Sequence, residues 1–177
     1  GVALLPLLTR QLSSGDDVGA AESQNRAIEF ALYLTLPAAA ALIAIAEPIV
    51  SVLFERGAFD AHAAEQTADA LAAFAVGLPA YVLIKALTPG FFARQDTATP
   101  VKIAVAAMVV NIVLAVALMQ ILAHVGIALA TACSAWINAA VLVGVLKRRK
   151  HFAVDARLRR NAPRTLLAAG LMAGALL

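Results

Sequence analysis

Ionisable side chains inside apolar stretches are the first candidates for chemistry in this sequence. Lys85 and Glu47 each stand among Ala, Leu, Ile and Val residues. Because burying a charge in apolar surroundings is costly, such a residue is a functional candidate by default. Lys85 either contacts a substrate or an ion-pair partner in a cavity, or anchors a helix by extending its long stem toward water. Glu47 is either a cavity carboxylate or a residue that faces polar headgroups.

Neutral polar side chains in the same stretches offer oxygen ligands for a cation. Asn111 and Thr131 fall in two neighbouring apolar runs. Their side-chain oxygens suit a small hard cation such as sodium. The alternative is that both residues form hydrogen bonds between packed helices. A sodium ion is the single cofactor that the sequence suggests.

Residues for catalysis or for a transition-metal site do not form a recognisable pattern. The chain has one cysteine and three widely spaced histidines. It contains no Gly-rich phosphate loop, no Ser-His-Asp arrangement and no pair of carboxylates in a polar segment. We therefore expect a protein that is not an enzyme.

The elements that carry these residues are predicted to be membrane-spanning helices. Of the 177 residues, 62% are apolar and 14% are charged, whereas about 25% of an average soluble domain is charged. A helix needs about 20 mostly apolar residues to cross a bilayer. Four stretches satisfy this requirement: residues 27–54, 71–93, 103–123 and 125–146. A soluble bundle is a poor alternative, because residues 103–123 lack the polar stripe of a surface helix.

The positive charges lie in alternate connecting segments. Lysine and arginine are concentrated in residues 9–26, 94–102 and 147–165. Residues 55–70 hold one arginine, and the connection around His124 holds neither lysine nor arginine. Because short cytoplasmic loops carry an excess of these residues, the first three segments are predicted to be cytoplasmic. The chain would then cross a bacterial inner membrane several times, most suitably as a transporter.

Residues 147–165 form the most basic segment. Its first four residues are cationic and directly follow an apolar run: Lys147, Arg148, Arg149 and Lys150. Such clusters attract anionic lipid headgroups. The segment is therefore either an anchor that fixes the orientation or a binding site for a phosphorylated lipid. Nucleic acid is not an expected partner, because no aromatic residues alternate with the basic ones.

Together these features predict an all-α, polytopic transmembrane helix bundle. Residues 1–165 would form the bundle, and residues 166–177 the start of a further transmembrane helix. The apolar runs at both termini predict a sequence truncated inside a helix at both ends, since about 12 helical residues span only roughly 18 Å. Thr99 is the expected N-cap of the helix after residue 99, with Pro100 in its first turn. Prolines are expected to bend or break the helices at four positions: Pro37, Pro48, Pro79 and Pro89.

Three stretches resemble segments of the MurJ (MviN) lipid II flippases, a family of the MOP exporter superfamily. Residues 1–9 (GVALLPLLT) resemble the end of that family's eighth helix, and residues 52–59 (VLFERGAF) resemble the segment after its ninth. Residues 89–102 (PGFFARQDTATPVK) resemble the segment after its tenth helix and include the most specific match. The three stretches occur in the family's order and at its spacing.

The resemblance implies a MOP-type lobe. The family has fourteen helices in two six-helix lobes and a final pair, and this chain would extend from the end of helix eight to the start of helix thirteen. The remaining N-terminal lobe of the same protein would be its partner, beside membrane lipid. The implied function is movement of lipid II, an undecaprenyl-pyrophosphate-linked peptidoglycan precursor, from the cytoplasmic to the periplasmic leaflet by alternating access.

The resemblance also suggests roles for single residues. Lys85 matches a lysine in helix ten of the relatives, and Lys85 and Glu47 are the candidate substrate-binding residues. Asn111 and Thr131 match two ligands of a sodium site in some members, although Ala115 replaces a carboxylate one turn after Asn111. The family's cytoplasmic motif is represented by Arg94, Gln95, Asp96, Thr97 and Pro100.

Two other functions fit the same sequence. A related exporter of drugs or of other lipid-linked oligosaccharides would have the same helices and would differ in the charges of its first lobe. A non-transporting membrane scaffold would recruit partners through residues 147–165, so charge reversals there would abolish its function.

Overall fold

The computed structural model describes residues 4–57 and 59–176 of the chain. The regular secondary structure of these residues is helical, and it comprises α1 (Leu4–Ser13), α2 (Asp17–Ala44), α3 (Ala46–Phe54), α4 (Ala61–Phe92), α5 (Ala98–Arg148) and α6 (Ala156–Leu176). The predicted all-α fold is confirmed. The first three residues of the stretch 1–9, Ala58 of the stretch 52–59 and the last residue of 166–177 lie outside the described residues.

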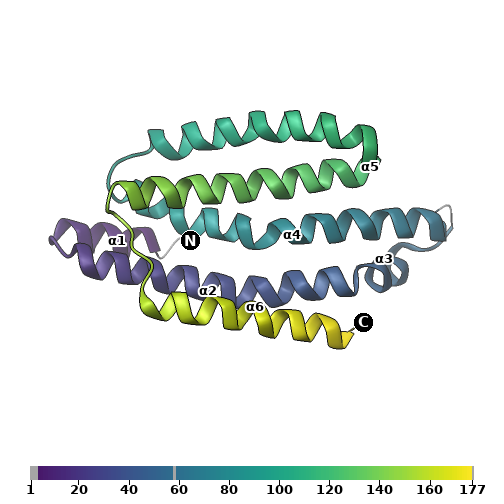
Figure 1. The fold of residues 1–177 in the computed structure, drawn as a ribbon, viewed down its shortest axis with the longest axis horizontal. Coiled ribbons are helices and arrows are strands. Elements are labelled where there is room, and N and C mark those ends of the chain that lie inside the picture. Colours follow the sequence, from purple (N-terminus) through teal and green to yellow (C-terminus); the bar gives the residue numbers. More distant parts are fainter. Residues whose placement is uncertain (1–3, 58, 177) are drawn as a thin grey trace.

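The long helices lie side by side in an elongated bundle (Figure 1). α4 packs against both α5 and α2, and α2 also packs against α6. The connections at residues 14–16, 93–97 and 149–155 gather at one end of the bundle, which we call the basic end (Figure 1). The α3–α4 connection and the bend of α5 lie at the opposite end. The three segments predicted to be cytoplasmic thus share one end.

α5 is a hairpin of two antiparallel arms (Figure 1). The chain reverses at Ala123, where φ is 47° and ψ is −129°. Gly126 lets the arms meet closely after the reversal, because a Cβ there would contact the Leu118 carbonyl group. The ring nitrogen Nε2 of His124 lies 2.9 Å from the carbonyl oxygen of Gln66, which joins the reversal to α4. The two arms contain the third and fourth predicted spans.

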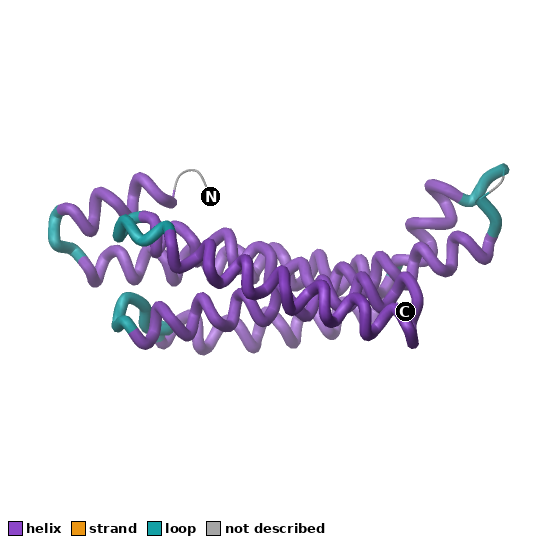
Figure 2. Tube along the Cα trace, turned by 90° about the horizontal axis from the view of Figure 1, so that it is seen from above, coloured by secondary structure: helices purple, strands orange, loops and turns teal. Residues whose placement is uncertain are grey.

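The first predicted span, residues 27–54, is divided in the structure. α2 ends and α3 begins on either side of Ile45, and Figure 2 shows the α3 end of the bundle turned sideways. Pro48 explains the division, because it has no amide hydrogen to donate to Ala44 and its ring would crowd that carbonyl group in a continuous helix. The other three prolines do not interrupt their helices: Pro37, Pro79 and Pro89.

Several helices extend beyond the apolar runs. α4 begins at Ala61, well before the predicted span 71–93, because the Asp60 carboxylate accepts a hydrogen bond of 2.9 Å from the Ala63 amide and caps the helix. α6 begins at Ala156, within the segment predicted to be a basic loop. The hydropathy pattern therefore predicts which part of each helix lies in the hydrocarbon core, but it does not predict where the helix begins or ends.

The described helices have the length and surface of a membrane protein. α2, α4 and α5 are long and apolar enough to cross a membrane. The first arm of α5, which precedes the reversal at Ala123, exposes large apolar side chains, among them Val113 at 62% and Ile121 at 80%. Such a surface requires an apolar solvent. The chain is a multi-pass membrane protein.

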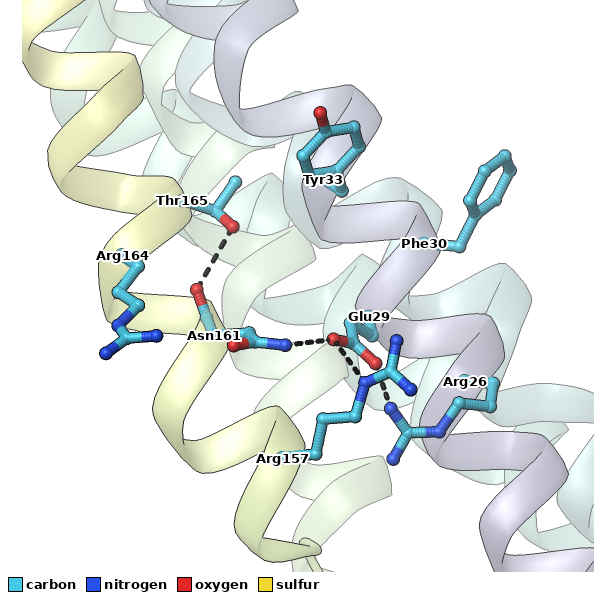
Figure 3. Close-up of a pocket in the computed structure, with 8 residues that line it drawn as sticks. All are labelled: Arg26, Glu29, Phe30, Tyr33, Arg157, Asn161, Arg164 and Thr165. Atoms are coloured by element: carbon cyan, nitrogen blue, oxygen red, sulfur yellow. Dashed lines mark hydrogen bonds and ion pairs between the residues drawn. The ribbon is translucent and has the colours of Figure 1, made fainter.

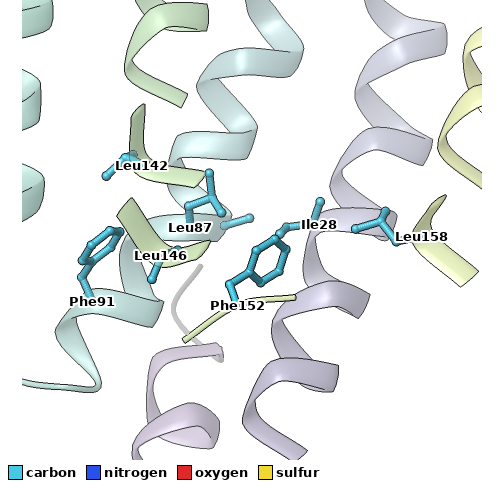
Figure 4. Packing of buried hydrophobic residues seen from close by; sticks show 8 residues of the cluster. Ile28, Leu87, Phe91, Leu142, Leu146, Phe152 and Leu158 are labelled. Atoms are coloured by element: carbon cyan, nitrogen blue, oxygen red, sulfur yellow. The ribbon is translucent and has the colours of Figure 1, made fainter. Parts of the chain in front are cut away.

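The largest apolar cluster of the described residues (Figure 4) includes Phe91 at the end of α4 and Phe152 in the α5–α6 connection, so it lies next to the basic end. It connects α2, α4, the second arm of α5, the α5–α6 connection and α6 through Ile28, Ala86, Leu87, Phe91, Leu142, Leu146, Phe152 and Leu158. Leu87 and Leu146 have no exposed surface. This cluster fixes the positions of the polar groups that surround the basic end.

Candidate functional site

Lys85 lies beside a groove that α1, α2 and α4 form. The groove has a volume of about 720 Å³ and a mostly apolar lining that includes Phe30, Leu34 and Phe92. The Lys85 side chain is exposed and makes no ion pair with the residues that the structure describes. The cation is therefore available to a ligand or to another segment of the protein.

The helical turn that follows Lys85 is held against α2 by a buried amide. Gln24 is 1% exposed, and its Nε2 donates to the carbonyl oxygens of Leu87 at 3.2 Å and Ala86 at 3.5 Å. Gly90 makes this approach possible, because a Cβ there would overlap the Gln24 amide group. Sequence reasoning missed Gln24. The available signal was Gly90 directly after Pro89, a small residue that lets another segment approach the helix.

Glu47 lies far from Lys85. It is an exposed residue in the first turn of α3, and the neighbouring Ala46 belongs to a cluster with Ala68 of α4. Ala68 and Lys85 are separated by 17 positions on α4, or roughly 25 Å. The structure does not bring the two predicted substrate-binding residues into one site.

The motif after α4 forms the N-terminal cap of α5. The Asp96 carboxylate accepts a hydrogen bond of 3.0 Å from the Thr99 amide, and it pairs with Arg149. Arg149 also donates to the Thr99 hydroxyl oxygen at 3.1 Å. The expected Thr99 cap is wrong: the helix begins at Ala98, and the longer reach of the Asp96 side chain supplies the capping oxygen. Thr97 occupies the N-cap position without a side-chain capping bond.

The contacts of Asp96 stabilise its ionised form. Hydrogen bonds from Thr99, first from its side chain and then from its backbone, together with Arg149, lower the pKa of Asp96 to about 2. The backbone of Gln95 before it is in the left-handed region, with φ at 59°, and Pro100 is buried in the first turn of α5. The motif therefore has a defined structural role at the basic end.

Arg94 connects three segments at the same end. Its side chain is 16% exposed and lies 3.9 Å from the Asp17 carboxylate at the start of α2. Its guanidinium also donates to the carbonyl oxygens of Gly90 at 2.9 Å and His151 at 3.5 Å. Burial is the main cause of the lowered pKa of Arg94. One side chain thus joins the end of α4 to α2 and to the α5–α6 connection.

The predicted lipid-headgroup run, residues 147–150, ends α5. Lys147 and Arg148 lie in the last helical turn, and Lys150 follows in the left-handed region with φ at 58°. All four side chains are exposed, but Arg149 is committed to Asp96. The other three cationic side chains of the run are exposed at the surface of the basic end.

Asn111 and Thr131 lie on facing arms of α5, where they take part in hydrogen bonds. Asn111 Nδ2 donates to the Ser134 hydroxyl oxygen at 3.0 Å, and Ser134 donates to the Thr131 carbonyl oxygen at 3.0 Å. The Thr131 hydroxyl donates to Ile127 within its own helix. Asn111 directs its amide nitrogen, and not its oxygen, toward the facing arm, which does not fit a sodium ligand, so we derive no ion-coupled step from these residues. Among the described residues, no cluster of His, Cys, Asp or Glu is able to hold a metal.

A pocket between α2 and α6 is a site that sequence reasoning missed (Figure 3). It has a volume of about 570 Å³ and is lined by Arg26, Glu29, Phe30, Tyr33, Arg157, Asn161, Arg164 and Thr165. Glu29 and Arg157 are separated by 128 positions, so no local motif predicts their contact. The available signal was a charged pair, Arg26 and Glu29, at the start of an apolar span.

Glu29 organises this pocket. Its carboxylate accepts hydrogen bonds from Asn161 and from Arg157 Nε, the second at 3.2 Å, and it also pairs with Arg26. Arg26 makes a second ion pair with Asp155 before α6. The polar contacts join the start of α6 to α2.

Known proteins resemble the chain along its whole length. A sequence profile of the family described as "Lipid II flippase MurJ" matches residues 1–177. The proteins named "Probable lipid II flippase MurJ" of Rhizobium tropici and Rhizobium meliloti (strain 1021) are 47% and 49% identical over 174 and 173 residues. Each alignment covers 98% of this chain, but 33% and 32% of the relative. The chain spans about a third of the length of these relatives.

A solved structure has a similar fold. The chain titled "Lipid II flippase MurJ, inward closed conformation" superimposes with a TM-score of 0.80 at 24% identity. The match covers 97% of this chain and 35% of that chain. This likeness concerns the arrangement of the helices.

Proposed function

The chain belongs to the family of the lipid II flippase MurJ, and we propose that it forms part of a transporter for undecaprenyl-pyrophosphate-linked peptidoglycan precursor. The family match over residues 1–177 is the observation that carries this proposal. Relatives named as lipid II flippases at 47% and 49% identity support it. Transport of this kind changes no covalent bond, so the proposed role is not enzymatic.

The distribution of charge supports an orientation with the basic end in the cytoplasm of a bacterial inner membrane. Residues 9–26, 94–102 and 147–165, which include or border the connections at that end, contain most of the lysines and arginines, as expected for cytoplasmic segments. The substrate would start in the cytoplasmic leaflet beside this end and leave at the opposite end. The further helices of the protein would supply the facing lobe for alternating access.

Lys85 is the residue that we assign to the substrate in this chain. A pyrophosphate group cannot cross hydrocarbon unaided because its charges are costly to desolvate. Lys85 places a cation beside a groove whose lining is mostly apolar. The ammonium group would bind the pyrophosphate, and the apolar lining would contact the lipid tail.

Rescue of bacteria depleted of their own lipid II flippase tests the proposal. The complete gene product that contains this sequence is expected to restore growth and to prevent precursor accumulation, which mass spectrometry measures. Failure of the wild-type protein to rescue, with its presence in the membrane verified by immunoblot, would overturn the proposed substrate.

Variants of Lys85 test the assigned residue separately. K85A is expected to weaken substrate binding about tenfold, which corresponds to about 1.4 kcal/mol, and thereby to lower plating efficiency, whereas K85R is expected to retain most activity. K102A, which removes another exposed lysine, is the matched control. Full rescue by K85A would leave the flippase function in place and reduce Lys85 to an interfacial anchor.

A further inference from the structure

The pocket between α2 and α6 lies where both helices change from polar to apolar. On α6 the last charged residue is Arg164, and Leu166 and Leu167 beyond it are 59% and 66% exposed. On α2 the change falls between Glu29 and Phe30, and no charged residue follows within the helix. Two helices therefore place the pocket at the same depth, at the boundary between headgroups and acyl chains.

Aromatic residues mark the same boundary. Phe30 and Tyr33 line the pocket and are 65% and 64% exposed. Tyrosine, whose ring has one polar edge, is enriched at the interface between membrane and water, and Phe30 adds an apolar ring beside it. The pocket thus combines an interfacial position with a lining of both charged and aromatic side chains.

The pocket carries a surplus of positive charge. Three arginines line it, and Glu29 is its single carboxylate. Glu29 and Asp155 together engage Arg26, whereas Arg157 contacts Glu29 through Nε and keeps its two terminal amino groups. Arg164 makes no hydrogen bond or ion pair within residues 4–57 and 59–176. Terminal groups of two arginines are therefore available to an anion.

Glu29 holds the pocket in shape rather than blocking it. The carboxylate already accepts bonds from Asn161, Arg157 and Arg26. These bonds orient the arginine side chains before a ligand arrives, which lowers the cost of binding. A volume of about 570 Å³ falls within the usual range of small-molecule sites.

We propose that this pocket binds the phosphate group of an anionic phospholipid from the surrounding membrane. Basic pockets between transmembrane helices on the cytoplasmic side bind such headgroups, and Arg157 and Arg164 supply planar donors that match phosphate oxygens. The exposed leucines of α6 would contact the acyl chains. The site shares Phe30 with the Lys85 groove but none of the other lining residues, and its proposed ligand is not the transported substrate.

Lipid retention by the purified complete gene product tests the site. The protein is equilibrated with an equimolar mixture of phosphatidylglycerol and phosphatidylcholine, and native mass spectrometry measures which lipids remain bound. The wild-type protein is expected to retain phosphatidylglycerol preferentially. Each arginine near an anionic lipid contributes roughly a five-fold change in binding. The R157Q/R164Q variant is therefore expected to retain at least about tenfold less phosphatidylglycerol than the wild-type protein.

R159Q/R160Q is the matched control. Arg159 and Arg160 are exposed on the same turn region of α6, but they do not line the pocket. This variant loses the same charge and is expected to retain the wild-type amount of lipid. Equal losses in the two double variants would overturn the proposal, because they would show diffuse surface attraction.

Two further measurements keep the proposal testable. R164Q removes a side chain that takes no part in the described hydrogen bonds and ion pairs between α2 and α6, so a loss of lipid in this variant does not follow from breaking those polar contacts. Inorganic phosphate is then added as a competitor. Displacement of phosphatidylglycerol by phosphate alone would overturn a lipid site, whereas resistance to phosphate supports one that also binds the acyl chains.

Discussion

The α4–α5 and α2–α6 interfaces differ in the chemistry that holds them. α4 and α5 meet through small residues, and a Cβ on Gly77 would lie 3.0 Å from Ala132 Cα. Their cross-helix polar contacts reach the backbone, as when Trp136 Nε1 donates to the Val76 carbonyl oxygen at 3.0 Å. α2 and α6 share the apolar cluster of Ile28 and Leu158, and they are joined in addition by the charged contacts of Glu29.

The difference separates a fixed contact from an exchangeable one. Small residues let backbones approach closely, and the resulting van der Waals packing depends on shape alone. A charged contact is weakened by salt and by competing ions. We infer that α4 and α5 move as a unit, whereas α6 is held by interactions that a ligand or a change of conditions is able to replace.

Enlarging Gly77 tests the fixed interface and has the largest expected effect. Gly77→Leu places a side chain against the Ala132 backbone, which cannot move aside, and is expected to cost about 3 kcal/mol. The measurement is the thermal unfolding temperature of the purified complete protein. Gly144→Leu is the control, since a Cβ at Gly144 meets no atom within 4 Å. Equal losses in both variants would contradict the close contact.

Removing the Glu29 carboxylate tests the exchangeable interface. The Glu29 side chain is 16% exposed, and hydrogen bonds to a charged group of this kind are worth about 2 kcal/mol. Glu29→Ala is expected to release the start of α6, which tryptic cleavage at Arg157, Arg159 and Arg160 measures. The control is Glu22→Ala on an exposed part of α2. Unchanged cleavage would show that apolar contacts alone hold α6.

The Asp96 pair predicts a smaller effect with a defined pH dependence. Its pKa falls from the ordinary value of 3.8 to about 2 in the folded protein. A lowered pKa gives a stabilising contribution that is present above pH 3.8 and is lost as the pH falls toward 2. Because Arg149 is 44% exposed, the loss is expected to be smaller than at Glu29.

Asp96→Asn should remove this part of the acid sensitivity. Unfolding temperatures between pH 4 and pH 2 are compared for the wild-type protein, this variant and Asp69→Asn, which changes an exposed residue of α4. The wild-type protein and the Asp69 variant should decline more steeply than the Asp96 variant. Parallel declines in all three would contradict the pairing.

The helix bundle was predictable because its apolar lengths follow from membrane thickness. The predicted spans 103–123 and 125–146 lie within α5, and the span 71–93 ends one residue beyond α4. The division at Ile45 was predictable only in part, since four prolines have the same local chemistry and only Pro48 interrupts a helix. The surrounding packing decides which proline a helix accommodates.

The site was less predictable because its contacts join distant segments. Lys85 stands out in the sequence as a charge in an apolar run. Gln24 and Glu29 form their contacts only when α4 and α6 pack beside α2, so their roles do not follow from the local sequence. A charge near the end of a span looks like an ordinary interfacial residue until its partners are known.

The smallest expected effect is that of a substitution at Asn111. This substitution distinguishes a role in helix packing from a role in cation binding. Asn111→Ala removes the bond to Ser134 and is expected to cost about 0.6 kcal/mol, a typical value for such bonds in membranes. Asn138 is the control, because its buried Oδ1 accepts no hydrogen bond from the described residues. Asn138→Ala should therefore cost less.

Comparing unfolding temperatures in sodium and in potassium chloride then distinguishes the two roles of Asn111. A ligand that binds only the folded protein stabilises it in proportion to its concentration. If Asn111 only packs the arms of α5, the two salts give equal unfolding temperatures for the wild-type protein and for Asn111→Ala. A sodium-specific increase that disappears in the variant would overturn this assignment. It would require the Asn111 amide to turn its oxygen toward the ion and to give up the bond to Ser134.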